Sequence, residues 1–370
     1  MKFVLPSREL NQLVNKCLGV VSPKPTVPIL GNLLIEAAND ELVITATDLT
    51  VGIRCFTEAK IIEEGVITVP SKYFSSLIKE LTATNVEITV GQNEIVEIVA
   101  DDSRFKLLGM SKNDFPALPN MQGALSMKMK QADLKEMLFR TAFAVSREDT
   151  RYVLTGVLLN INDGKATCMG TDGKRLARTT KPIEINSSVS GSYVLPIKAV
   201  DEILTNLQNE GDATLLILND RIAVETENMM LITKLLSGQY PDVNRVIPDR
   251  SSATMILHRE ELMILLRQIA LFSEHHSVKF VFTDGELRLN ANAAAVGEGK
   301  VSMPVNYRGD KFEIAFNPNY FLDILRHINA ENVALGVTDS YSPGLITEES
   351  AQGSPEGSSL FVLMPLRLDE

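Results

Sequence analysis

The chain has 370 residues, 45% of them apolar, and its 36 Lys and Arg face 47 Asp and Glu for a formal net charge of −11. This length allows two or three domains, and the acidic balance disfavours a protein that holds nucleic acid by charge alone, because tight binders show a basic footprint. Three widely separated cysteines (Cys17, Cys55, Cys168), with neither a signal peptide nor an apolar run of roughly 18 residues, exclude a disulfide-rich secreted protein and a helical membrane protein and predict a cytoplasmic one.

A helical apolar stripe recurs three times along the chain. From Leu10, mostly apolar residues follow the spacing i, i+3, i+4, i+7 and i+8, and the same spacing returns from Leu134 and from Leu262. The offsets are 124 and 128 residues. This spacing is one face of an α-helix, and it predicts that Cys17, on the first stripe, is a small buried side chain.

A proline that opens a second helix recurs with a similar period. Pro70, Pro196 and Pro318 each precede or occupy a first helical turn, with apolar residues three, four and seven positions later. The pair Thr47-Asp48 returns as Thr171-Asp172, and Phe115-Pro116 returns as Tyr240-Pro241. Several anchors in one order with nearly equal offsets indicate a threefold internal repeat.

Between these anchors the chain has the pattern of β-hairpins. Residues 33–37 and 42–46 flank the polar pair Asn39-Asp40, and 157–161 with 165–168 and 279–282 with 286–289 flank similar polar turns. We therefore predict an α+β fold with antiparallel sheets, in three domains at 1–120, 121–246 and 247–370 with linkers near 118–122 and 246–252. The Ser- and Gly-rich stretch 349–359 is predicted to be a loop before the last strand.

Over essentially its whole length the sequence resembles the beta subunit of bacterial DNA polymerase III, the sliding-clamp family. The resemblance lies in short segments at residues 25–34, 149–152, 171–177, 240–246 and 362–368. None is a catalytic motif, but their order and spacing agree with the threefold repeat. The resemblance implies three clamp domains with antiparallel sheets outside and helices lining a central hole. It also implies a non-enzymatic processivity factor that closes as a head-to-tail homodimer ring around double-stranded DNA.

The family resemblance implies a set of residues that contact the DNA backbone without reading bases. These residues are Lys24, Arg147, Tyr152 and Lys198. The family more often has Arg at position 24, so Lys24 keeps the charge and loses the bidentate geometry. The alternative for each residue is an ordinary solvated charge or a packed tyrosine. A ring reconciles the acidic net charge with a role on DNA, because it holds DNA by topology and needs little electrostatic affinity.

The resemblance also implies a groove between the second and third domains. It would bind a short linear motif of DNA polymerase, the clamp loader and repair proteins. The matching residues are Leu154, Thr171, Gly173, Arg175, Leu176, Pro241, Arg245, Val246, Val362, Met364, Pro365, Leu366 and Arg367. Their aliphatic side chains suit apolar anchors, Met364 suits varied partners, and the arginines are expected at the rim. Lys174 stands where the family more often has His. The alternative is simple packing of a domain interface.

For the dimer, the resemblance implies that Phe105 and Leu107 of one chain meet Leu271 and Phe272 of another, where two strand edges pair. The alternative is core packing within each domain.

Enzymatic interpretations find no support in the sequence. His275 and His276 are adjacent and make a poor metal pair, and no HExxH motif or nucleophile elbow occurs. The stretch 297–300 resembles a phosphate loop but lacks its first glycine at Ala294 and its Ser or Thr at Val301. We expect no catalytic residue, metal or cofactor. The main alternative function is a three-repeat scaffold that binds proteins and never surrounds DNA, and the second is an enzyme with a pocket between repeats.

Overall fold

The computed structural model describes residues 1–148, 150–183, 189–349 and 359–367. The chain forms two compact units, the first mainly from Met1–Lys135 and Lys198–Leu235 and the second from Glu136–Ile183, Ser190–Ile197 and the described part of Leu236–Glu370. The unit boundary passes through the middle third of the chain, and the division into three domains at 120 and 246 stays a prediction. Asp149, in one of the segments that carry the family resemblance, and nearly all of the predicted loop 349–359 lie outside the described residues.

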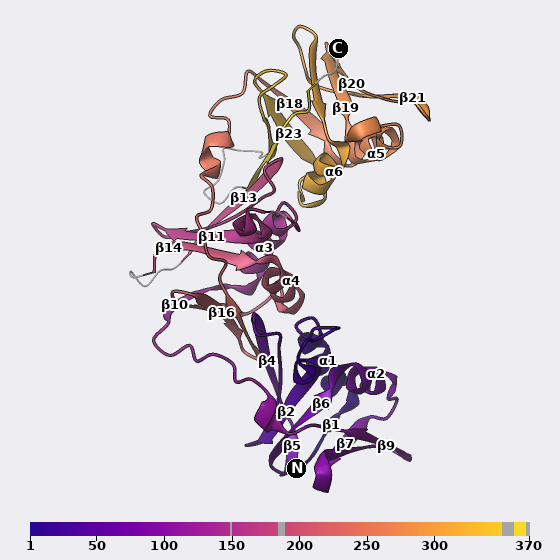
Figure 1. The fold of residues 1–370 in the computed structure, drawn as a ribbon. Helices are drawn as coiled ribbons and strands as arrows, with labels where there is room; N and C mark the ends of the chain where they lie inside the picture. Colours follow the sequence, from indigo (N-terminus) through magenta and orange to yellow (C-terminus); the bar gives the residue numbers. More distant parts are fainter. Residues whose placement is uncertain (149, 184–188, 350–358, 368–370) are drawn as a thin grey trace. The chain divides into compact units, whose positions relative to one another are not determined.

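The described residues contain six α-helices, labelled in Figure 1. They are α1 (Ser7–Leu18), α2 (Ser71–Glu80), α3 (Gln131–Ala142), α4 (Ile197–Asn206), α5 (Arg259–Ala270) and α6 (Pro318–Arg326). The three predicted stripes lie on α1, α3 and α5, and the three prolines lie at the starts of α2, α4 and α6, so both predictions are confirmed. In α1 the stripe from Leu10 to Cys17 is buried, and Cys17 has no exposed surface.

The first unit holds two antiparallel sheets. A five-stranded sheet has the order β5-β1-β7-β8-β9, and an eight-stranded sheet has the order β10-β15-β16-β17-β4-β3-β2-β6. The strands are β1 (Lys2–Pro6), β2 (Asn32–Ala38), β3 (Glu41–Thr47), β4 (Val51–Glu58), β5 (Lys60–Glu63), β6 (Gly65–Pro70), β7 (Asn85–Val90), β8 (Ile95–Ala100), β9 (Ser103–Leu108), β10 (Leu125–Lys130), β15 (Asp212–Ile217), β16 (Arg221–Thr226) and β17 (Met229–Lys234).

The second unit repeats this plan with an eight-stranded sheet of order β14-β11-β12-β13-β25-β24-β23-β18 and a four-stranded sheet of order β21-β20-β19-β22. Its strands are β11 (Gly156–Asn162), β12 (Lys165–Thr171), β13 (Arg175–Pro182), β14 (Gly191–Pro196), β18 (Ala253–His258), β19 (Val278–Thr283), β20 (Glu286–Ala293), β21 (Gly297–Pro304), β22 (Phe312–Phe316), β23 (Asn332–Val337), β24 (Gly344–Glu348) and β25 (Ser359–Leu363).

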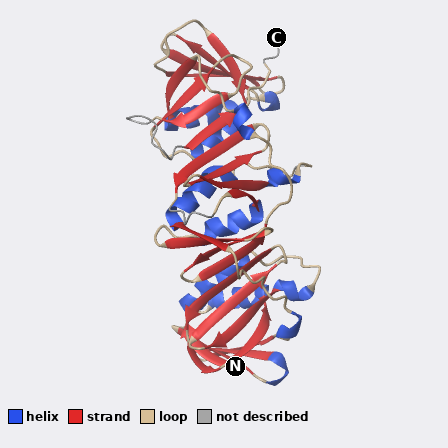
Figure 2. Ribbon diagram, turned by 90° about the vertical axis from the view of Figure 1, so that its left-hand side faces the viewer, coloured by secondary structure: helices blue, strands red, loops and turns tan. Residues whose placement is uncertain are grey.

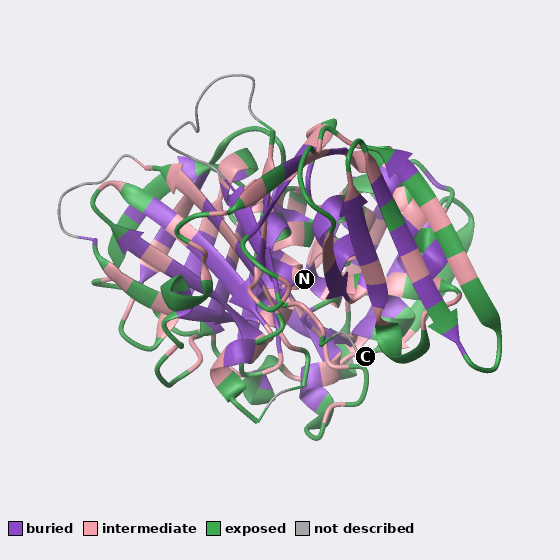
Figure 3. Ribbon diagram, turned by 90° about the horizontal axis from the view of Figure 1, so that it is seen from above, coloured by how far each residue is buried: buried purple, intermediate pink, exposed green. Residues whose placement is uncertain are grey.

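The three predicted hairpins are β2–β3, β11–β12 and β19–β20, and all are antiparallel as expected. Asn39 and Asp40 have φ angles of 50° and 59°, the positive values that a tight two-residue hairpin turn requires. Burial alternates along β20, and Figure 3 shows buried and exposed residues alternating along several strands, because successive side chains point to opposite faces. One face of each sheet is therefore available for helices.

Helices pack directly against these sheets (Figure 2): α1 contacts β3 and β4, and α5 contacts β20 and β21. The core of the second unit includes a cluster of aromatic rings, in which Phe280 stacks on Phe321 and meets Phe316 edge to face. No helix in the described ranges is both long enough and apolar enough to cross a bilayer.

Each eight-stranded sheet joins strands from two successive repeats. In the first unit β4 pairs with β17, and in the second unit β13 pairs with β25. The two pairs are equivalent in the repeat. β4 corresponds to β13, because both follow a Thr-Asp turn, and β17 corresponds to β25, because both are the last strands of their repeats. We call the surroundings of the β4–β17 pair the first junction and those of the β13–β25 pair the second junction.

Candidate functional site

The four candidate DNA contacts lie in the expected kinds of element. Lys24 and Arg147 are exposed in the loops that follow α1 and α3, and Tyr152 begins a short 3-10 helix with 64% of its surface exposed. Lys198 is in the first turn of α4. The loops and the first turn match the sequence prediction, but only three of the four side chains are freely exposed.

Lys198 is held by the first junction. Its Nζ lies 2.5 Å from Oδ2 of Asp48 and donates to the carbonyl oxygen of Val20 at 3.1 Å. Burial by itself raises the pKa of Asp48, but hydrogen bonds from Lys198 and from two backbone amides outweigh it, so the pKa lies below its ordinary value. Lys198 therefore ties α4 to the β3–β4 turn, an interaction that sequence reasoning missed.

The candidate partner residues are arranged around a turn at the second junction. Thr171 accepts from the amide of Gly173 at 3.1 Å, and Oδ1 of Asp172 accepts from the amides of Lys174 and Arg175 at 2.9 and 3.0 Å. Gly173 has a φ of +83°, which suits glycine. The turn begins β13, whose pairing with β25 sets Leu176 opposite Val362.

Arg175 is engaged on every side by its own chain. Its Nε lies 3.1 Å from Asp172, one terminal nitrogen lies 2.7 Å from Asp323 of α6, and the other donates to the carbonyl oxygen of Phe143 at 3.0 Å. The guanidinium also lies 4.5 Å from the ring centre of Tyr320. Because its side chain is only 11% exposed, Arg175 holds the second junction together and is not a free rim donor.

An apolar cluster lies beneath this turn. Leu176 and Val362 pack there with Leu158, Met169 and Val243, with Tyr240, Ile247 and Leu345 around the margin. Val246 and Met364 remain 41% and 37% exposed. We call the exposed and half-buried residues of this region, Gly173, Pro241, Arg245, Val246, Met364 and Pro365, the partner surface. It offers aliphatic side chains over a rigid base.

The remaining candidates of this set differ in position. Leu154 is buried in the 3-10 helix before β11, and the side chain of Arg245 is 83% exposed beside Asp242. Leu366 donates its amide to Ala315 of β22. Arg367 lines a separate cavity of about 540 Å³ with Lys279 and Glu298, so the structure does not bring it together with the partner surface.

The candidate dimer residues lie at two sheet edges. Phe105 is 37% exposed and Leu107 half-buried on β9, the edge of the five-stranded sheet. Leu271 is 76% exposed just after α5, and Phe272 packs beneath β21 at Gly299, where a side chain on the glycine would collide with it. β21 is the edge of the four-stranded sheet.

Charge is unevenly divided between the helices and the rest of the chain. The six helices of the described residues carry ten Lys and Arg against nine Asp and Glu, a net charge of +1, whereas the whole chain has a net charge of −11. The acidic excess therefore belongs to the strands and loops, and the helices are close to neutral.

These features define a class of protein. It is a repeat protein whose successive repeats share continuous sheets, and its candidate sites are surfaces at the junctions and sheet edges. Among the described residues no group of three or more His, Cys, Asp or Glu is arranged to hold a metal ion.

Known proteins specify the class further. Models of the N-terminal, central and C-terminal domains of the DNA polymerase III beta subunit match residues 1–119, 128–242 and 244–361. The beta sliding clamp of Chlamydia pneumoniae is 53% identical, and that of Pseudomonas aeruginosa is 30% identical, each over the full length of both chains.

Solved structures agree with these sequence matches. A DnaN sliding clamp of Pseudomonas aeruginosa bound to griselimycin superposes with a TM-score of 0.94 at 30% identity, and the Bacillus subtilis clamp with 0.93 at 25%, both covering all of each chain. The chain belongs to the DNA polymerase III beta subunit family, the beta sliding clamps, which are non-catalytic processivity factors of replication. The predicted family and α+β clamp fold are confirmed.

Proposed function

We propose that two copies of this chain close head to tail into a ring that encircles duplex DNA and tethers the replicative polymerase to it. The observation that carries the proposal is the pair of unfilled edges, β9 and β21. Within the chain, the strand after each Thr-Asp turn pairs with the last strand of the following repeat, as β4 does with β17 and β13 with β25. In the third repeat β21 follows the β19–β20 hairpin as β4 follows β2–β3 and β13 follows β11–β12, so it is their counterpart. In this scheme β21 requires the last strand of a first repeat, which is β9 of a second copy.

The side chains at these edges support that pairing. Phe105 and Leu107 on β9, and Leu271 and Phe272 beside β21, are apolar groups that an edge-to-edge contact would cover. Two strand edges would lose their unpaired amides and carbonyls at the same time. Two identical contacts related by a twofold rotation close a ring.

Nearly neutral helices suit a protein that holds DNA by topology. The proposal places the helices toward the DNA, with Lys24, Arg147, Tyr152 and Lys198 at or near its backbone. A net helix charge of +1 does not repel phosphates, unlike the acidic remainder of the chain, and it is too small to bind them tightly. Because Lys198 is already paired with Asp48, we expect Lys24 and Arg147 to contribute more to DNA contact.

The partner surface is proposed to bind a short linear segment of DNA polymerase, the clamp loader and repair proteins. Val246 and Met364 expose aliphatic groups above the buried cluster of Leu176 and Val362, which suits an apolar anchor. Arg175 acts here as a positioning residue, since its contacts with Asp172 and Asp323 fix the turn that borders the surface.

Solution mass tests ring closure. The wild-type chain is expected near twice 40.7 kDa, and Leu271→Glu is expected to shift it toward the monomer, because the change buries a charge at the proposed contact. Ile62→Glu is the matched control: Ile62 is 53% exposed on β5, the opposite edge of the β9 sheet, and this variant should stay dimeric. A monomeric wild type, or a dimer indifferent to Leu271→Glu, contradicts ring closure.

Partner binding is tested separately. Met364→Ala should weaken binding of the cognate polymerase to the immobilised clamp roughly tenfold, a typical loss for one apolar anchor contact. Removing residues 364–370 should abolish binding while the dimer persists. Leu125→Ala, at a comparably exposed apolar residue on β10, is the control and should bind normally. Unchanged affinity in both altered chains contradicts the assignment of the partner surface.

A further inference from the structure

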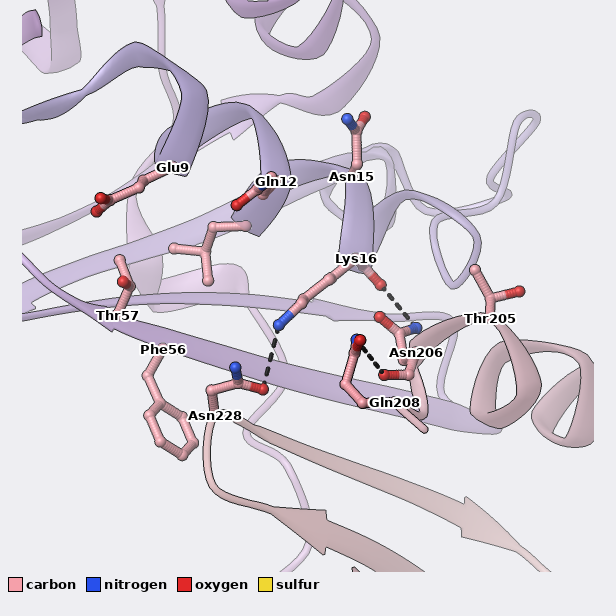
Figure 4. A pocket seen from close by; sticks show the side chains of 11 residues that line it. Glu9, Gln12, Asn15, Lys16, Phe56, Thr57, Thr205, Asn206, Gln208 and Asn228 are labelled. Carbon is pink, nitrogen blue, oxygen red and sulfur yellow. Dashed lines mark hydrogen bonds between the residues drawn. The ribbon is translucent and has the colours of Figure 1, made fainter. Parts of the chain in front are cut away.

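A polar cleft of about 550 Å³ lies in the first unit. Figure 4 shows its lining side chains, which come from α1, β4, the end of α4 and the β16–β17 turn. They include Glu9, Gln12, Lys16, Thr57 and Asn228. The cleft is dominated by amide and hydroxyl groups, which both donate and accept hydrogen bonds.

Lys16 supplies the positive charge in this cleft. Its Nζ donates to Oδ1 of Asn228 at 3.1 Å, and among the described residues it makes no ion pair. The backbone oxygen of Lys16 accepts from Asn206 of α4 at 3.3 Å, which holds this end of α1 in place. The ammonium therefore lies on a fixed helix end with an uncharged partner.

The internal repeat contains a closed counterpart of this cleft. An offset of 124 residues carries Gln12 to Glu136, Lys16 to Arg140 and Thr57 to Lys181. At the second junction these residues form a charged network: Arg140 lies 3.0 Å from Glu136 and 2.9 Å from Glu348 of β24, and Lys181 lies 2.7 Å from Glu136.

The two equivalent sites differ in the group that faces the cation. Arg140 is buried, with a side chain only 6% exposed, and it receives a carboxylate from Glu348. Lys16 receives an amide from Asn228. The second junction thus shows, within the same chain, which group completes a site of this geometry, and the first junction lacks it.

The geometry points to the cleft at Lys16 as a binding site for an acidic segment of a partner protein, with a carboxylate of the partner on Lys16 in the role that Glu348 has on Arg140. The amides of Gln12 and Asn228 would hydrogen-bond the backbone of that segment. The cleft contains a single cation and also Glu9, so it accepts one carboxylate and opposes a run of phosphates. A peptide fits this pattern better than a nucleic acid.

The test selects peptides on the full-length wild-type dimer. A phage-displayed library of random 12-residue peptides is the probe, and clones are counter-selected on Asn228→Glu, which supplies the missing carboxylate from within the chain. We expect clones rich in Asp or Glu whose synthetic peptides bind the wild type and lose about tenfold or more in affinity on both Lys16→Met and Asn228→Glu, the loss expected for one charged hydrogen bond.

Lys79→Met is the matched control, because Lys79, like Lys16, is a lysine in the last turn of a helix, and it lies outside the cleft. It should bind the selected peptides as the wild type does. Thermal melting of all three variants checks that they fold. Failure to enrich acidic clones, equal binding to Asn228→Glu, or displacement of the peptide by an equimolar short DNA duplex overturns the proposal, the last by assigning the cleft to phosphate.

Discussion

The two junctions share one backbone plan and differ in how their side chains hold it. Each has a Thr-Asp turn whose aspartate accepts two amide hydrogen bonds, followed by a strand that pairs with the end of the next repeat. At the first junction a single lysine, Lys198, reaches Asp48. At the second, Arg140 is buried between two glutamates, and Arg175, which is 11% exposed, contacts two aspartates and the ring of Tyr320.

Strand pairing is common to both junctions, so it does not by itself account for the difference between their side-chain networks. The second junction carries the proposed partner surface, and a rigid base lowers the entropy cost of binding a peptide. The first junction retains an open polar cleft at the position where the second has a closed ion network. The repeated backbone places an equivalent site at each junction. Ion pairs close the site at the second junction, and their absence among the described residues leaves the site at the first junction open.

The largest effect is expected at Arg175. Arg175→Ala leaves Asp172 and Asp323 without their buried partner, and it should lower the free energy of unfolding by about 3 kcal/mol. Arg245→Ala, at an 83% exposed arginine that also pairs with an aspartate, should change it by no more than about 0.5 kcal/mol. Denaturant unfolding measures both free energies. Similar values would contradict the distinction between Arg175, which holds the second junction together, and the exposed Arg245.

Equivalent positions in the two clefts should respond unequally. Arg140→Met removes a buried cation that pairs with both Glu136 and Glu348, and should cost about 2 kcal/mol. Lys16→Met removes one exposed hydrogen bond to the amide of Asn228 and should cost about 0.5 kcal/mol or less. If the lysine variant lost as much stability as the arginine variant, the first cleft would be a structural site and its openness would have no functional meaning.

The Asp48–Lys198 pair should make the first junction sensitive to acid. Because the pKa of folded Asp48 is lowered, its charge stabilises the fold above the ordinary aspartate pKa, and this contribution is lost as pH falls through the folded pKa. Lys198 is 41% exposed, so Asp48→Asn should cost only about 1 kcal/mol at pH 7. Unfolding curves of the two proteins should converge below about pH 4. A gap that persists at low pH would show that the charge is not responsible.

The smallest effect concerns the equivalent turn residues Leu49 and Gly173. Leu49 has a φ of +75° and is 57% exposed, a conformation that is unfavourable for leucine. Leu49→Gly should therefore stabilise the chain slightly, by about 0.5 kcal/mol, whereas Gly173→Ala should destabilise it by about 1 kcal/mol. Thermal melting gives both signs, and a destabilised Leu49→Gly would indicate that the leucine makes a needed contact.

Local patterns in the sequence predicted the local structure well. The stripes from Leu10, Leu134 and Leu262 placed three helices, and the pair Asn39-Asp40 placed a tight turn, because each depends on neighbouring residues only. The threefold repeat and the family resemblance placed the fold. The helix and turn signals depend on spacing within about a dozen residues, and the repeat depends on offsets of 124 and 128 residues, all of which a sequence displays directly.

The chemistry of the junctions was beyond such patterns. Lys198 was predicted to be a DNA contact, yet its partner Asp48 lies 150 residues away and is brought near only by the sheet of the first unit. Arg175 meets Asp323 from 148 residues away, and Arg140 of the second repeat meets Glu348 of the third. The sequence does contain one signal of this chemistry. The repeat offset relates Gln12, Lys16 and Thr57 to three charged residues, so the ion pairs of the second site indicate what the first site lacks.

Retention on DNA of different topology measures encirclement most directly. Labelled clamp is loaded by its cognate loader onto nicked circular DNA, freed of loader, and followed before and after a restriction enzyme linearises the circle. We expect stable retention on the circle and rapid loss after cutting, with retention restored when both ends are blocked by bound protein. Equal retention on circular and open linear DNA, or none on either, contradicts a ring and favours a scaffold that binds proteins alone.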